Sequence, residues 1–162
     1  MRTIKIGIIG SGGIARAHVE AYKQLPYVEV AAVADVVPGR AKQFAEAQGL
    51  ANAAAFDSHD ELLKLPLDGV SICTPNVAHY RTTIDSLRAG KHVLLEKPMS
   101  VTLAEAVDMV AAQKAAGTLL SIGFQPRYDP NMKLLRKIVQ SGRLGNIYYV
   151  EVGGGRRRGM PG

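Results

Sequence analysis

Short apolar runs alternate with longer amphipathic stretches over the first 124 residues of the chain. The apolar runs predict strands, because a strand in a covered sheet is apolar on both faces. These runs cover residues 3–10, 28–35, 53–56, 69–74, 92–96 and 118–124. The amphipathic stretches repeat apolar side chains every three or four positions, which is the period of a helix. They predict helices over residues 13–24, 38–48, 78–89 and 102–116, with a shorter helical turn over 59–65.

Residues with known positional preferences mark several ends of these helices. We expect Pro38 to open the second helix, because proline is favoured in a first helical turn. Asp57 or Ser58 is expected to cap the short helical turn. Gly90 and Gly117 are expected to end the helices that precede them.

Wholly apolar strands that alternate with helices indicate a parallel sheet covered on both faces. Connections of this kind are right-handed in nearly all known cases. Six such strands in succession predict an α/β, doubly wound (Rossmann) parallel sheet, which we expect to form a nucleotide-binding domain over residues 1–125. Beyond it, a predicted helix over 130–141 and a predicted strand over 146–152 have no further strand after them. We expect residues 126–162 to be the start of a second, truncated α/β substrate and oligomerisation domain.

The net charge of +6 comes from the carboxyl-terminal part of the chain. Residues 1–126 carry twelve basic and twelve acidic side chains, whereas residues 127–162 carry eight basic and two acidic ones, including three arginines at 156–158. No aromatic platform or basic helix accompanies these arginines. A neutral body with a basic end therefore argues against a nucleic-acid partner.

Composition also bears on where the protein works. No apolar run approaches the roughly 20 residues that a membrane-spanning helix needs, so we expect no membrane partner. The first residues enter a strand pattern directly, without the small-residue cleavage site of a signal peptide. Cys73 is the only cysteine, so no internal disulfide can form and a reducing cytoplasm is the expected location. We expect Cys73 to be a small core residue.

The segment GSGGIA, residues 10–15, fits the pattern G-x-G-x-x-G/A where a strand gives way to a helix. Gly10 allows the tight turn, Gly12 lets the backbone approach a pyrophosphate, and Ala15 keeps the helix close to the sheet. The pyrophosphate is expected at the start of the helix, around Gly13 and Ile14, where free N–H groups favour negative charge. A flavin nucleotide would normally bring further binding elements from a larger chain, and S-adenosylmethionine usually has a different glycine pattern, so neither fits as well.

Asp35 closes the second predicted strand, 25 residues after Gly10. A carboxylate there accepts hydrogen bonds from an adenosine ribose and repels a 2′-phosphate, which favours NAD over NADP. Arg40 can weaken that preference by reaching a phosphate, so NADP stays open. A second interpretation makes Asp35 the cap of the helix that follows Val37.

Ligands of an open parallel sheet bind beyond the carboxyl ends of its strands. Two unusual segments follow the fourth and fifth strands there, CTPNVAHY and EKPMS. They supply the further candidate cofactor-binding residues Thr74, Pro75, Asn76, His79, Glu96 and Lys97. A second interpretation makes His79 a contact at the start of the following helix. Lys97 is also the candidate catalytic residue, since a lysine beside a nicotinamide can bind a substrate hydroxyl or move its proton. The alternative leaves Lys97 as a solvated residue after a strand. His18 is expected at the surface or in packing, and no metal-ligand cluster is visible.

Four segments, GIIGSGGIARAH, CTPNVAHY, HVLLEKPMS and SGRLGNIYYVEV, together resemble the Gfo/Idh/MocA family of sugar and cyclitol dehydrogenases. The resemblance covers essentially the whole chain, and its E-K-P tripeptide is the most specific part. It implies hydride transfer between a nicotinamide cofactor and a sugar, inositol or related polyol. It places Lys97 where nicotinamide and substrate meet, has Pro98 shape the turn, and directs Glu96 toward the cofactor's ribose. Family members are commonly homo-oligomers.

The chain also departs from the family pattern. Members usually carry a second half with a large sheet, most of the substrate pocket and an Asp and His pair. No D-x-x-x-H pattern follows residue 126, and no histidine follows His92. We therefore expect this chain to bind cofactor but to lack the full catalytic site. Two alternatives stay open: a non-catalytic dinucleotide-binding sensor or regulatory module, and an interaction domain whose glycine turn holds no ligand.

Overall fold

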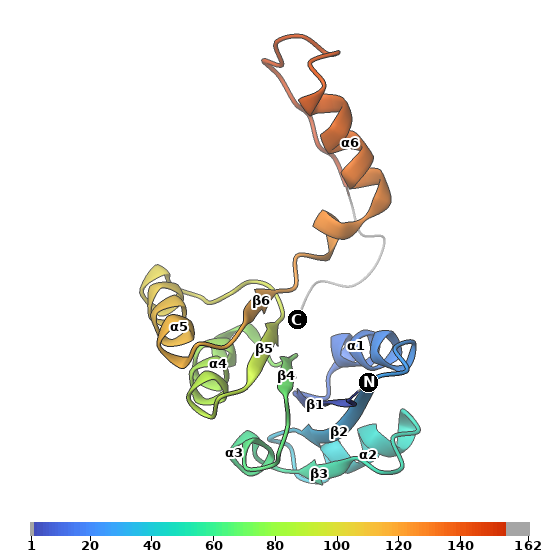
Figure 1. Ribbon diagram of the computed structural model, residues 1–162, viewed down its shortest axis with the longest axis vertical. Coiled ribbons are helices and arrows are strands. Elements are labelled where there is room, and N and C mark those ends of the chain that lie inside the picture. The colour runs from blue at the N-terminus through green and yellow to red at the C-terminus, as the bar shows by residue number, and fades with distance from the viewer. Residues whose placement is uncertain (1, 155–162) are drawn as a thin grey trace. The chain divides into compact units, whose positions relative to one another are not determined.

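The computed structural model describes residues 2–154 of the chain (Figure 1). It divides into two compact units, Met1–Phe124 and Gln125–Gly162, each described here by itself. The arginines at 156–158 lie outside the described residues. Within residues 2–154, no helix is both long and apolar enough to cross a bilayer.

A six-stranded sheet forms the centre of the first unit, and all of its strand pairs are parallel. Its order is β3-β2-β1-β4-β5-β6, the order of a doubly wound nucleotide-binding sheet. The strands are β1 (Ile4–Ile9), β2 (Val28–Ala34), β3 (Ala54–Phe56), β4 (Gly69–Ile72), β5 (His92–Leu95) and β6 (Leu120–Ile122). The predicted fold class is confirmed.

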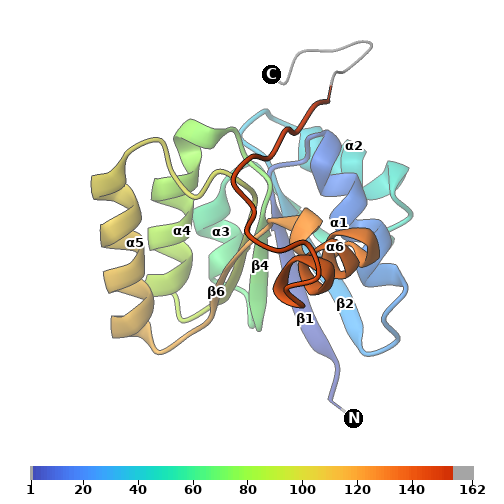
Figure 2. The ribbon, with the colours of Figure 1, turned by 90° about the horizontal axis from the view of Figure 1, so that it is seen from above.

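Five α-helices cover this sheet in two groups (Figure 2). They are α1 (Gly13–Lys23), α2 (Arg40–Ala47), α3 (His59–Leu63), α4 (His79–Arg88) and α5 (Leu103–Ala116). Two separate apolar cores show the division. Ala15 and Val19 of α1 pack with Ile8 and Val33 in one core. The other core contains buried side chains of α3, α4 and α5, among them Met109. The sheet is therefore covered on both faces, as its largely apolar strands require.

The helix ends follow local chemistry, with one correction. Thr102 and Glu105 form a capping box at the start of α5, and Gly117 ends that helix in the left-handed conformation. Ser58, and not Asp57, caps α3, because its hydroxyl accepts from the Asp60 N–H. The prediction that α2 opens at Pro38 was wrong, because the preceding turn extends through Gly39, which has a φ of 75°, and the helix begins at Arg40.

The second unit contains one α-helix within its described residues, α6 (Pro130–Gln140), preceded by the short 3₁₀ helix η2 (Gln125–Tyr128). Asp129 caps α6 by accepting from the N–H groups of Asn131 and Met132. The strand predicted over residues 146–152 is wrong, since these residues form no strand. A strand needs a partner for its backbone hydrogen bonds, and the described part of this unit contains no other strand.

Candidate functional site

The glycine turn between β1 and α1 is wedged against the ends of two neighbouring strands. The Gly10 N–H donates to the Ala34 carbonyl of β2 at 2.8 Å. Gly10 has a φ of 90°, and a Cβ there would lie 2.8 Å from the carbonyl carbon and oxygen of Cys73. Only glycine fits both the conformation and the space. The turn is thus fixed by the exits of β2 and β4.

Gly12 and Gly13 are not crowded in this way. A Cβ added at either position would meet no atom of residues 2–154 within 4 Å. Gly12 is the N-cap of α1, and no side chain in the described part of the chain caps the N–H groups of that helix end. Ala15 is buried against the sheet, whereas Ile14 is partly exposed. The start of α1 therefore presents open backbone donors with no side chain in front of them, which is the form of an anion-binding helix terminus.

Asp35 follows β2 and is tied to this turn. One of its carboxylate oxygens accepts from the Ser11 N–H at 2.9 Å and from the Ser11 hydroxyl at 2.6 Å. The other accepts from the Val37 N–H at 3.0 Å. Burial alone raises the pKa of Asp35, but the hydrogen bonds from Ser11 and Val37 outweigh it and lower the pKa below its ordinary value. Asp35 is therefore a fixed anion beside the open end of α1.

The alternative role of Asp35, as the cap of α2, is wrong. Gly39 is the N-cap of α2, and no side chain caps that helix. Sequence reasoning also missed Ser11, which joins the glycine turn to the carboxylate. The signal in the sequence was the position of Ser11 inside the glycine turn, where its hydroxyl can reach a neighbouring carboxylate.

At the exit of β4, the Thr74 hydroxyl is buried and has no hydrogen-bond partner within residues 2–154. Pro75 and Asn76 are exposed, and Asn76 opens the 3₁₀ helix η1 (Asn76–Ala78) that leads into α4. The same is true of the Thr83 and Thr118 hydroxyls within these residues, so it is the position of Thr74 beside Gly10 that makes its hydroxyl a candidate ligand contact.

His79 requires a correction. It was expected to face the cleft as a cofactor contact, but its side chain is 0% exposed. Its Nδ1 lies 2.7 Å from the Pro98 carbonyl oxygen and its Nε2 lies 3.0 Å from the Thr74 carbonyl oxygen. A buried ring with both nitrogens against backbone carbonyls does not offer either nitrogen to a cofactor. His79 instead connects the segments that follow β4 and β5.

At the exit of β5, Glu96 is 5% exposed and paired with a histidine of α1. One carboxylate oxygen of Glu96 lies 3.0 Å from Nε2 of His18, and the other accepts from the Lys97 N–H at 3.2 Å. Nδ1 of His18 lies 3.2 Å from the Ser71 hydroxyl, which is 2.6 Å from the hydroxyl of Tyr22. These buried and half-buried groups form a continuous hydrogen-bonded network that reaches the backbone N–H of Lys97.

Sequence reasoning left His18 at the surface or in packing, without a partner. The signal that indicated otherwise is helical spacing: Ala15, His18, Val19 and Tyr22 lie on the face of α1 that packs against the sheet. Lys97 itself is exposed, and its ammonium group has no hydrogen bond or ion pair within the described part of the chain. The peptide bond between Lys97 and Pro98 is cis.

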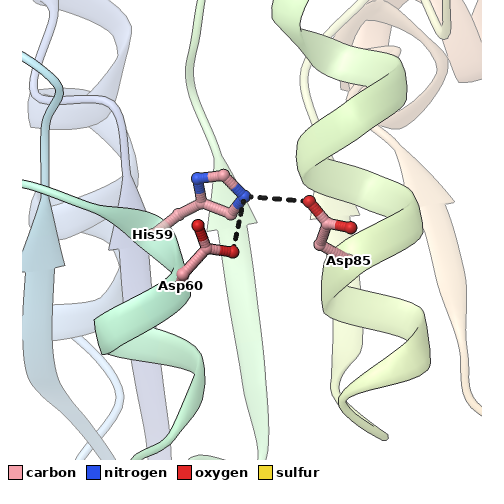
Figure 3. Close-up of side chains that lie close together, drawn as sticks. All are labelled: His59, Asp60 and Asp85. Carbon is pink, nitrogen blue, oxygen red and sulfur yellow. Dashed lines mark hydrogen bonds and ion pairs between the residues drawn. The ribbon is translucent and has the colours of Figure 1, made fainter.

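A second polar cluster joins α3 to α4 (Figure 3). His59, Asp60 and Asp85 place potential metal-ligand atoms within 4.8 Å of one another, a grouping that the sequence did not reveal. One oxygen of Asp85 already lies 3.1 Å from Nε2 of His59 and accepts from Nε of Arg81 at 2.5 Å. The cluster is accounted for as a set of ion pairs that joins α3 to α4.

A hollow of about 580 Å³ lies between α4 and α5 and is lined by residues of both helices, among them four alanines of α5. None of the residues that line it belongs to the glycine turn or to the segments that follow β4 and β5. The candidate site is instead the edge of the sheet at which β1, β2, β4 and β5 end, because Gly12, Asp35, Thr74 and Lys97 follow these four strands.

Comparison with known proteins places this arrangement in a family. Residues 4–124 match the family model described as an oxidoreductase family with an NAD-binding Rossmann fold. The chain belongs to the Gfo/Idh/MocA oxidoreductase family. The matched residues contain the glycine turn, Asp35 and the E-K-P tripeptide. The predicted family and the expectation of a nicotinamide cofactor are confirmed at the level of the family.

Similar proteins include dehydrogenases of sugars and inositols. D-glucoside 3-dehydrogenase of Escherichia coli is 35% identical over 98% of this chain and 45% of its own length. The WlbA dehydrogenase of Bordetella pertussis, solved with NADH and UDP-GlcNAcA, is 31% identical with a TM-score of 0.84, covering 91% of this chain and 45% of that one. Myo-inositol dehydrogenase of Lactobacillus casei, solved with NAD(H) and myo-inositol, is 29% identical with a TM-score of 0.82, covering 88% of this chain and 43% of that one.

The chain thus spans less than half the length of each of these relatives. The shared part is the part that contains the parallel sheet and the candidate site.

Proposed function

We propose that this chain is the cofactor-binding part of an NAD(P)-dependent dehydrogenase that acts on a sugar, an inositol or a related polyol, with NAD preferred over NADP. One observation carries the proposal. No atom of residues 2–154 fills the space in front of Gly12 at the amino-terminal end of α1, and a fixed carboxylate, Asp35, lies beside that end. An anion on the helix terminus and a ribose hydroxyl on the carboxylate are the two contacts that a dinucleotide needs there.

The residues of the site fit such a cofactor. Backbone N–H groups around Gly12, Gly13 and Ile14 would hold the pyrophosphate, and Asp35 would accept from the adenosine ribose. Thr74, Pro75 and Asn76 follow β4 and would border the middle of the cofactor, with the buried Thr74 hydroxyl as a donor without another partner. Glu96 and Lys97 would lie at its nicotinamide end. When bound, the cofactor supplies hydride acceptance or donation.

Lys97 is the proposed catalytic residue of this chain. In the oxidation of a secondary alcohol, hydride leaves the carbon while the hydroxyl proton passes to a nearby group. Lys97 is exposed at the carboxyl end of β5 and can hydrogen-bond a substrate hydroxyl there. Its role is to orient that hydroxyl and to assist the movement of its proton.

The whole protein's organisation is also a proposal. We assign residues 1–125 to the nucleotide-binding domain and residues 126–162 to the start of a substrate and oligomerisation domain, as the relatives are more than twice as long. The substrate then binds with residues outside this chain, the chain alone is inactive, and the intact protein is a homo-oligomer of the cytoplasm.

The test is calorimetric titration of the 162-residue chain with NADH and, separately, with NADPH. Micromolar binding of NADH, at least ten-fold tighter than that of NADPH, is the expected result, because Asp35 repels a 2′-phosphate. Binding of neither nucleotide would overturn the proposal for this chain. Joining the chain to the second half of a relative and assaying NADH formation on polyols separates a dehydrogenase from a non-catalytic dinucleotide sensor.

A further inference from the structure

Residues 96–98, here called the EKP turn, are contacted by two histidines from helices of the two different groups, the buried His79 and the half-buried His18. His79 opens α4, and its Nδ1 lies 2.7 Å from the Pro98 carbonyl oxygen. Its other ring nitrogen lies 3.0 Å from the Thr74 carbonyl oxygen. A neutral imidazole has one N–H and donates to one of these two carbonyls, while the ring itself contacts the exits of both β4 and β5.

His18 reaches the same turn from α1. Its Nε2 lies 3.0 Å from a carboxylate oxygen of Glu96, whose other oxygen accepts from the Lys97 N–H at 3.2 Å. The space for this carboxylate depends on Gly123, since a Cβ there would lie 2.9 Å from the Glu96 oxygen that faces His18. Glu96 is thus in contact with Gly123 and hydrogen-bonded through both of its carboxylate oxygens.

The orientation of the His18 ring is set by its second partner. The hydroxyls of Tyr22 and Ser71 lie 2.6 Å apart, and the Ser71 hydroxyl lies 3.2 Å from Nδ1 of His18. If Tyr22 donates to Ser71 and Ser71 donates to Nδ1, the remaining ring N–H is on Nε2 and donates to Glu96. Each of the four polar side chains in this series, from Tyr22 to Glu96, then has a hydrogen-bond partner, as polar groups out of contact with water require.

We propose that His18 and His79 are positioning residues that hold the EKP turn from both sides and so fix the direction in which Lys97 leaves it. Lys97 is exposed and its ammonium group has no partner within residues 2–154, so the backbone that carries it decides where the side chain points. The purpose of this clamp rests on the proposed dehydrogenase function, but the clamp itself is a property of the folded chain.

The first test measures amide hydrogen exchange by mass spectrometry on the 162-residue chain and on His18→Ala and His79→Ala. His59→Ala is the matched control, because His59 is also partly buried and hydrogen-bonded, to Asp85, but lies on α3. Amides of residues 95–101 should exchange at least ten-fold faster in both clamp variants, while amides of β1 change less than three-fold. The control should leave residues 95–101 unchanged.

The second test follows Lys97 itself. Lysines are methylated with a ¹³C label, and the Lys97 signal is identified by its loss in Lys97→Arg. In the unsubstituted chain NADH should shift this signal. In both clamp variants this NADH-induced shift should be less than half of that in the unsubstituted chain, while the dissociation constant of NADH should stay within three-fold of the unsubstituted value. Millimolar imidazole, which can enter the space left in His79→Ala, should restore at least half of the lost shift and protection.

A merely structural role predicts different results. Exchange in residues 95–101 that rises no more than in β1, or as much in His59→Ala, would overturn the clamp. If the alanine variants do not fold, His18→Leu and His79→Leu fill the space but remove the ring nitrogens, and the same comparison of exchange decides. A chain that binds no NADH at all would contradict the proposed function, and the exchange measurement would still test the clamp by itself.

Discussion

Replacing Gly12 with valine tests the candidate site most directly, because the folded chain and a bound dinucleotide respond to that side chain differently. Gly12 has a φ of −77° and a ψ of −172°, which any residue adopts. An added Cβ meets no protein atom within 4 Å. The valine therefore projects into the space in front of α1, where the pyrophosphate is proposed to bind.

The expected magnitudes follow from this geometry. Glycine is an acceptable N-cap and valine a poor one, so the free energy of unfolding should fall by about 1 kcal/mol. For a domain of this size that corresponds to a melting temperature lower by about 2–4 °C. A side chain in the path of the pyrophosphate should weaken NADH binding by at least about 100-fold, or about 2.8 kcal/mol.

Two comparison variants make the measurement specific. Ala21→Val places the same side chain on the exposed face of α1 and should leave NADH affinity unchanged. Gly10→Ala should instead damage the fold, because its Cβ would lie 2.8 Å from the Cys73 backbone at a φ of 90°. Strain of both kinds together should cost about 3 kcal/mol or more.

Calorimetric titration with NADH and thermal unfolding followed by circular dichroism are measured for all four proteins. Unchanged NADH affinity in Gly12→Val would refute the placement of the pyrophosphate. A loss of affinity accompanied by a fall in melting temperature as large as that of Gly10→Ala would also refute it, because the effect would then be one of folding.

Three further substitutions probe neighbouring groups. Lys97→Ala should leave NADH affinity within three-fold, since Lys97 is assigned to the substrate; a loss like that of Gly12→Val, measured by the same titration, would contradict that role. Asp35→Asn should reduce the ratio of NADH to NADPH affinity at least ten-fold, because the charge that repels a 2′-phosphate is gone; an unchanged ratio would mean that another group sets the preference. In Asp85, burial raises the pKa but the hydrogen bonds from Arg81 and His59 outweigh it, so the pKa is lowered. The ionised form therefore stabilises the fold above the ordinary pKa of 3.8 and this stabilisation is lost as pH falls through the lower folded-state value. Asp85→Asn should lower the free energy of unfolding by about 1 kcal/mol at pH 7, measured by urea unfolding. This difference in free energy from the unsubstituted chain should shrink below the ordinary pKa. A difference that stays constant across that pH range would contradict the ion-pair account.

The order of elements in the first unit was predictable because its signals are local. Wholly apolar runs and helical periodicity marked all six strands and their helices, and Thr102, Glu105 and Gly117 carry the chemistry of the ends of α5. The parallel arrangement followed from the alternation of strands and helices. The start of α2 was misplaced, because the left-handed turn at Gly39 extends the loop past Pro38.

The strand expected over residues 146–152 failed for a different reason. Its apolar residues, including Tyr148 and Tyr149, match a strand pattern, but a strand exists only where another strand accepts its hydrogen bonds. Within its described residues the second unit offers none, and Tyr148 is 98% exposed. Pattern alone does not supply the partner.

By itself, the sequence determined the fold class, the glycine turn, Asp35 and Lys97, because each is carried by a periodicity or by a short motif at an element boundary. Only the tertiary structure decided which side chains hydrogen-bond to these residues and their neighbours. His18 meets Glu96 across 78 positions, and Ser11 meets Asp35 across 24. His79 turned from an expected cofactor contact into a buried link between two strand exits. The physical reason is that a polar side chain on a packed helix face needs a hydrogen-bond partner from the strand that lies opposite it. The topology decides which strand that is, and the local sequence does not encode the topology.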